Sequence, residues 1–222
     1  MKGNGFAHLR NLLNSTESSR QLTPEEIDSA IHLARNNESV NRYDPGLPGV
    51  AKYLAQTGGL NEVYKAIELA LESKDDRWSR HFVLAILAER LIIAGDMPRV
   101  YELISQIEKD ATSVEDNNDY WPAQKAQMWE TIADLYFRLG NEEKVSFVVA
   151  NASRIATAGQ FDMNAQEAYE CEIILRGLVG KLMSIYRFAT ALKIVETSDW
   201  HDKTAWIDAL NTIIASDIRY QR

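Results

Sequence analysis

The apolar residues of this 222-residue chain recur at intervals of three and four, the spacing of helices that bury one face. The pattern is clearest before Gly140, where Trp129, Ile132 and Tyr136 fall on a single helical face. Gly140 is then expected to end the helix, because glycine adopts the left-handed conformation without steric cost. A second apolar stripe follows at once, over residues 145–152. We therefore predict an antiparallel helical hairpin around Gly140.

The same arrangement of stripe, turn and stripe recurs along the chain. Turns are predicted at Gly58, Gly95 and Gly140, which lie about 37 and 45 residues apart. A fourth copy downstream has Tyr186 where the turn glycine would stand, so the sequence leaves its boundary open. A single hairpin leaves an apolar face that only another hairpin can cover. The repetition thus predicts an all-α array of antiparallel hairpins.

The best-formed copy resembles a tetratricopeptide repeat (TPR), whose signature is W-x2-L-G-x2-Y before the turn and A-x3-F after it. The matching positions here are Trp129, Ile132, Ala133, Tyr136, Gly140, Val145 and Val149. The resemblance implies a TPR-like α-solenoid over residues 46–222, a class of scaffold that binds other proteins. The turn spacings exceed the roughly 34 residues of the regular repeat. A related hairpin array with longer helices is therefore the alternative.

The two ends of the chain are less regular. Residues 1–45 are predicted to be an N-terminal helical extension and a turn-rich linker, with a first helix over residues 6–13. Thr23, followed by Pro24 and Glu26, predicts the start of another helix, since threonine and glutamate at this spacing form a capping box. Asp202 is expected to begin a last helix that caps the array.

The resemblance also implies where a partner would bind, because the first helix of each TPR hairpin lines a concave groove. Carried over residue by residue, the implied partner-binding set is Phe82, Glu89, Ile92, Gln127, Glu130, Asp134, Phe137 and Arg176. Some TPR proteins hold a peptide's terminal carboxylate with basic and amide side chains in this groove. Three of the positions here are acidic instead, so we expect an acidic groove that binds a neutral or basic segment. The alternative is that the polar members only decorate the surface and that the apolar members pack in the core.

Composition and charge narrow the partners. The formal net charge is −8, and no cluster of lysine and arginine stands out, so we expect no nucleic-acid ligand. No stretch reaches the roughly 18 consecutive apolar residues of a membrane span. The single cysteine, Cys171, excludes an intramolecular disulfide and favours a reducing compartment. A cytoplasmic protein without a membrane partner is therefore expected.

Candidate chemistry is sparse. The four histidines lie far apart without the spacing of metal ligands, and no nucleophile has an orienting base nearby in the sequence. Cys171 falls within an apolar pattern, and Gly177 and Gly180 favour close helix packing or a bend rather than a phosphate loop. We therefore expect no catalytic, cofactor or metal site, and no enzyme.

Three functions remain open at this stage. The first is a non-enzymatic adaptor or chaperone-like scaffold that binds a peptide or helix of another protein along the acidic groove. The second is a regulatory or host-interaction factor, such as an inhibitor or antitoxin, that docks on a folded partner. The third is self-assembly into a homo-oligomer through exposed hairpin ends.

Overall fold

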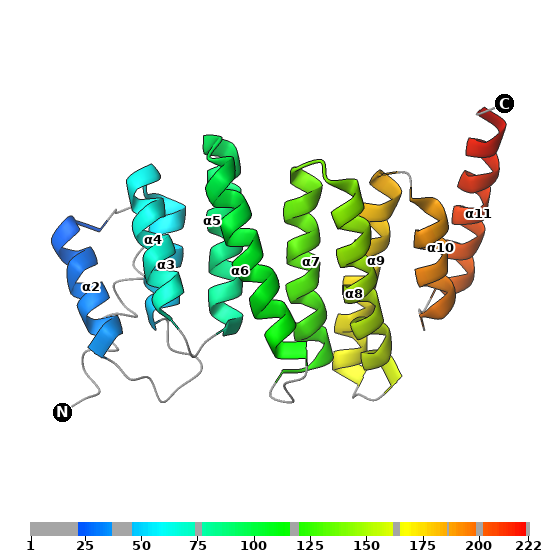
Figure 1. Cartoon of the computed structure of the whole chain (residues 1–222). Helices are drawn as coiled ribbons and strands as arrows, with labels where there is room; N and C mark the ends of the chain where they lie inside the picture. Colours follow the sequence, from blue (N-terminus) through cyan, green and yellow to red (C-terminus); the bar gives the residue numbers. More distant parts are fainter. Residues whose placement is uncertain are drawn as a thin grey trace. The chain divides into compact units, whose positions relative to one another are not determined.

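The computed structural model describes residues 22–36, 46–73, 77–115, 120–161, 165–185, 187–198 and 202–220. Within these ranges the chain is all-α, and its ten helices pack in sequential pairs (Figure 1). Two compact units are present, Met1–Ile107 and Glu108–Arg222. The boundary between the units falls inside one helix.

The first unit contains four whole helices and the start of a fifth. These are α2 (Pro24–Asn36), α3 (Gly46–Thr57), α4 (Leu60–Glu72), α5 (Arg77–Ala94) and the beginning of α6 (Met97–Glu115). Helix α3 packs against α4, both of them contact α5, and α2 packs on α3. The largest fully buried side chains of this unit are those of Leu54, Leu84, Leu87, Leu91, Ile104 and Ile107.

The second unit contains the end of α6 and five further helices. They are α7 (Pro122–Arg138), α8 (Glu142–Phe161), α9 (Ala165–Ser184), α10 (Phe188–Thr197) and α11 (Lys203–Tyr220). Each of the first four contacts the next helix along the chain, and α7 also contacts α9 directly. The core of the unit includes Met128, Ile132, Leu135, Leu175 and Leu178, all fully buried.

Two of the predicted turns share one backbone structure. Gly95 and Gly140 have positive φ angles of 78° and 67°. At the second turn, Asn141 N–H donates to the Tyr136 carbonyl and Gly140 N–H donates to the Phe137 carbonyl, both at 3.0 Å. Gly95 and the residue after it form the equivalent bonds at the first turn. This is the Schellman ending of a helix, and it confirms both predicted helix ends.

The other two predicted turns are built differently. Gly58 separates α3 from α4 without a positive φ, and it needs to be glycine for space, since an added Cβ would collide with Glu62 and with the Leu54 carbonyl. The turn between α9 and α10 is closed by Arg187 N–H, which donates to the Leu182 carbonyl at 2.8 Å. All four predicted hairpin turns therefore separate helices.

The chain ends agree with the sequence where the structure describes them. Thr23 N–H donates to Glu26 Oε2 at 2.8 Å and Glu26 N–H donates to Thr23 Oγ1 at 3.3 Å, so the predicted capping box is confirmed. Helix α11 begins directly after Asp202, as expected. The helix predicted over residues 6–13 lies outside the described residues. Nothing tests the predicted domain boundary at residues 45 and 46, and it stays a prediction.

Candidate functional site

A cluster of charged side chains joins α7 to α9 in the second unit. Lys181 Nζ lies 3.0 Å from Glu130 Oε1 and 3.2 Å from Asp134 Oδ1. The side chains of Lys181 and Glu130 are only 17% and 21% exposed, whereas that of Asp134 is 48% exposed. Two of the acidic side chains in the predicted partner-binding set therefore share a cation that sequence reasoning did not identify.

Gly177 on α9 lies against the carboxylate of Glu130 on α7. A Cβ atom placed on Gly177 would lie 2.7 Å from Glu130 Oε1, closer than such contacts allow. The glycine thus leaves room for the Glu130 carboxylate between the two helices. At Gly180 an added Cβ would meet no atom within 4 Å, so packing does not explain that glycine.

The outward side of α9 carries two exposed apolar side chains beside this cluster. Tyr169 and Ile173 are 58% and 52% exposed. They stand four residues apart, and Gly177 and Lys181 follow at the same interval, so each of the four positions neighbours the next one along the helix. We use the name α7–α9 face for Gln127, Glu130, Asp134, Tyr169, Ile173 and Lys181, the side chains that lie along the contact between α7 and α9 or on the adjoining outward side of α9.

The predicted site residues of this unit are distributed around the α7–α9 face. Gln127 is exposed on α7, and Phe137 is 40% exposed near the end of the same helix. Arg176 forms an ion pair within α9, with its Nη2 atom 2.6 Å from Glu172 Oε1. The structure therefore brings Glu130 and Asp134 together through Lys181, and it holds Arg176 within α9 through Glu172.

The remaining predicted site residues lie on α5, in the first unit. Phe82 packs edge-on against Trp78, with the ring centroids 4.7 Å apart. Glu89 and Ile92 are half-buried. The partner-binding role assigned to these three residues stays a prediction.

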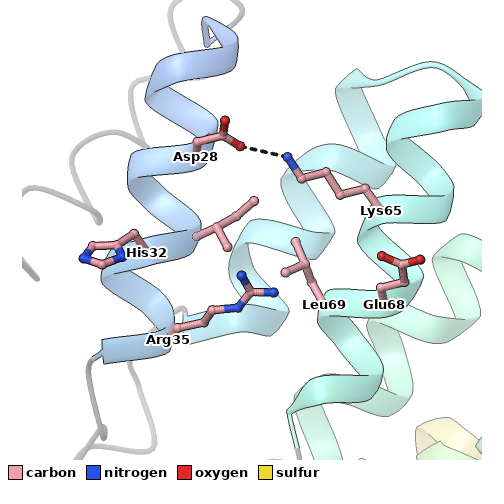
Figure 2. A pocket seen from close by; sticks show the side chains of 7 residues that line it. Asp28, His32, Arg35, Lys65, Glu68 and Leu69 are labelled. Carbon is pink, nitrogen blue, oxygen red and sulfur yellow. Dashed lines mark hydrogen bonds and ion pairs between the residues drawn. The ribbon is translucent and has the colours of Figure 1, made fainter.

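The first unit also has a cavity of about 390 Å³ between α2 and α4 (Figure 2). It is lined by Asp28, Ile31, His32, Arg35, Lys65, Glu68 and Leu69. Lys65 Nζ reaches Asp28 Oδ1 across the cavity at 2.9 Å, and Arg35 pairs with Glu72 on α4. Sequence reasoning missed this site, because the pattern of one helix does not reveal how its residues align with those of another.

Cys171 lies in the core of the second unit and is fully buried. Burial, with smaller contributions from Glu170 and Glu167, raises the pKa of its thiol to about 11. The thiol is therefore protonated at neutral pH and is a poor nucleophile. Among the residues that the structure describes, no three His, Cys, Asp or Glu side chains come together in a way that could hold a metal ion.

No helix in the described part of the chain combines the length and apolar character that crossing a bilayer requires. Comparison with protein-family models, with characterised proteins and with solved structures gave no match.

Proposed function

We propose that this chain is a non-enzymatic protein-interaction scaffold of TPR-like helical hairpins, and that it binds a partner protein's segment along the α7–α9 face. The shared backbone bonding at Gly95 and Gly140 supports the repeat, because two turns 45 residues apart end their helices in the same way. In this proposal α7 and α9 are the first helices of successive hairpins, and their common face is the groove of the second unit.

The observation that carries the proposal is the exposure of Tyr169 and Ile173. Single exposed apolar side chains are common on protein surfaces and need no explanation. These two are each more than half exposed and lie one turn apart on α9, the helix that also carries the half-buried Lys181. An aromatic and an aliphatic anchor beside fixed polar groups is the composition of a protein interface.

The charges on the α7–α9 face favour a basic or neutral segment. Glu130 and Asp134 supply two carboxylates, and Lys181 supplies one cation. Lys181 is held by both carboxylates, so the surplus charge is negative, and Asp134 is the most exposed member of the Lys181 cluster. A basic side chain next to an apolar one would complement this surface.

Site-specific photocrosslinking tests the proposal directly. A photoreactive phenylalanine analogue at position 169 should crosslink one defined partner in the source cell. Phe147 on α8 is 59% exposed and offers the matched position, because the same analogue there should not capture that partner. Asp134→Asn should weaken the crosslink at position 169. Equal capture at positions 169 and 147, or none at either, would contradict the proposal.

The captured protein also separates the three functional classes. A partner whose isolated basic segment binds the chain as tightly as the whole protein would support the scaffold. Binding that requires the folded domain would favour the inhibitor-like or antitoxin-like alternative. Crosslinking of the chain to a second copy of itself would replace both with homo-oligomer formation.

A further inference from the structure

Two ion pairs connect α2 with α4, and the sequence separation between the partners is the same in both. The basic residue belongs to α4 in one pair and to α2 in the other. Lys65 on α4 pairs with Asp28 on α2, and Arg35 on α2 pairs with Glu72 on α4. Both pairs join residues 37 positions apart, and the two pairs are separated by seven residues on each helix. The two helices therefore run parallel, with an ion pair at either end of a segment two turns long.

The cavity of about 390 Å³ lies between these two ion pairs. Ile31 and Leu69 are 5% and 2% exposed, so they give the cavity an apolar floor. Glu68 and His32 line it at the same level along the two helices (Figure 2). The volume of the cavity falls within the range of ligand-binding pockets. Its rim is charged, so it suits an elongated side chain with a polar end better than a wholly apolar ligand.

The charges around the cavity differ in how they are satisfied. Lys65 is held by Asp28, and Arg35 donates to the Glu72 carboxylate from Nε at 2.9 Å and from Nη2 at 2.8 Å. Glu68 is exposed and has no hydrogen bond or ion pair with any other residue that the structure describes. A carboxylate beside the apolar floor is therefore available to an incoming cation.

We propose that this cavity binds an arginine side chain of a partner protein. The methylene stem would lie over Ile31 and Leu69, and the guanidinium group would meet Glu68, since guanidinium and carboxylate match in geometry. An acidic side chain is disfavoured, because the lining cations Lys65 and Arg35 are already held by Asp28 and Glu72, and Glu68 would repel it. This site goes beyond the α7–α9 face and depends on none of its residues.

The test measures how two peptides bind to the full-length protein, with methyl NMR as the readout. The tripeptide Ac-Gly-Arg-Gly-NH2 should shift the methyl resonances of Ile31 and Leu69 in a saturable manner. The same tripeptide with citrulline has a neutral urea in place of the guanidinium and nearly the same shape, so it should bind more weakly. Glu68→Gln should reduce the affinity for the arginine peptide about two- to fivefold and leave that for the citrulline peptide unchanged.

The control variant is Glu25→Gln, which makes the same charge change on an exposed part of α2 outside the cavity and should alter neither affinity. Because Glu68 is exposed, the melting temperature of Glu68→Gln should equal that of the wild type, which separates lost binding from lost folding. Any one of three results would overturn the proposal. The two peptides could bind equally well, the arginine peptide could bind Glu68→Gln as tightly as wild type, or the methyl resonances of Ile31 and Leu69 could fail to shift. The crosslink at position 169 is an independent result, so either proposal can fail alone.

Discussion

The carboxylate of Glu130 on α7 occupies the space left by the missing side chain of Gly177 on α9. Glu130 Oε1 accepts a hydrogen bond from Lys181 Nζ at 3.0 Å, and a Cβ atom on Gly177 would lie 2.7 Å from that same oxygen. The glycine thus makes room for the ion pair that connects the two helices of the proposed binding face.

Alanine at Gly177 should stabilise the protein less than alanine at Gly180. Replacing a helical glycine with alanine gains up to about 1 kcal/mol of helix propensity. Gly180 is exposed with open space around it and should give the whole gain. At Gly177 the new methyl group displaces Glu130 from Lys181, so we expect roughly 0.5 kcal/mol or more of the gain to be lost. Urea unfolding of the two variants measures the difference.

The control for this pair is the Glu130→Ala background, in which the carboxylate that faces Gly177 is absent. The two glycine variants should then gain the same stability. Equal gains already in the wild-type background would show that the contact between Glu130 and Gly177 does not constrain the helices.

Trp129 should be among the most costly side chains to remove. Its side chain is 5% exposed, and its Nε1 atom has no hydrogen-bond partner among the described residues, so its contribution is packing. Trp129→Ala should lower the free energy of unfolding by about 3 to 5 kcal/mol. Trp121, which precedes the same helix and is 53% exposed, provides the control, and its replacement should cost about 0.5 kcal/mol. A near-neutral Trp129→Ala would contradict the hairpin packing deduced from the repeat.

The turn at Gly140 should tolerate asparagine better than alanine. A Cβ atom at Gly140 would meet nothing within 4 Å, so the cost of a substitution comes from the positive φ of 67° alone. Gly140→Ala should cost about 1 to 2 kcal/mol, and Gly140→Asn less, because asparagine enters the left-handed region more readily. Thermal unfolding of both variants checks this order, and equal losses would argue against backbone strain as the cause.

Local features of the fold were predictable from the sequence because they depend on residues close together in the chain. The capping box of Thr23 with Glu26 and the glycine turns at Gly95 and Gly140 each form within six residues. The length of α6 also had a signal, since Ala111 and Val114 continue the buried stripe of Ile107 at intervals of four and three. The end of α8 had none as clear. In the structure α6 continues to Glu115 and α8 to Phe161.

The candidate sites were only partly predictable, because they depend on the register between helices. The spacing of α7 indicated that Glu130 and Asp134 share its open face. It could not indicate that Lys181, which is 51 residues beyond Glu130, would neutralise part of that charge. The cavity between α2 and α4 likewise depends on an offset that side-chain packing sets. Tyr169 and Ile173 had a detectable signal, as apolar residues off the buried stripe of α9.

Cys171 should react with thiol reagents only when the protein unfolds or the pH is high. Its pKa of about 11 exceeds the value near 8.5 of a free cysteine, so the thiolate is scarce at neutral pH, and burial blocks access. The pKa of the Cys171 thiol is higher in the folded state than in the unfolded state. Burial of the protonated thiol therefore contributes fully to stability below the unfolded pKa, and this contribution falls as the pH rises towards 11. Alkylation at pH 7.5 should therefore follow the unfolding transition in urea, and fast alkylation of the native protein would contradict the burial.

The ion pair between Arg35 and Glu72 should be visible in the titration of one carboxyl group. The hydrogen bond from Arg35 is the main cause that holds the pKa of Glu72 below its ordinary value of 4.5. A lowered folded pKa means that the stabilisation is complete above the unfolded pKa and is lost as pH falls through the folded pKa. In a carbon-detected NMR titration, the midpoint of Glu72 should lie below 4.5 and should rise towards that value in Arg35→Gln. The control is Lys65→Gln, which removes only the ion pair with Asp28 and should leave the midpoint of Glu72 unchanged. A shift as large as that in Arg35→Gln would mean that the two ion pairs act as one unit holding α2 against α4.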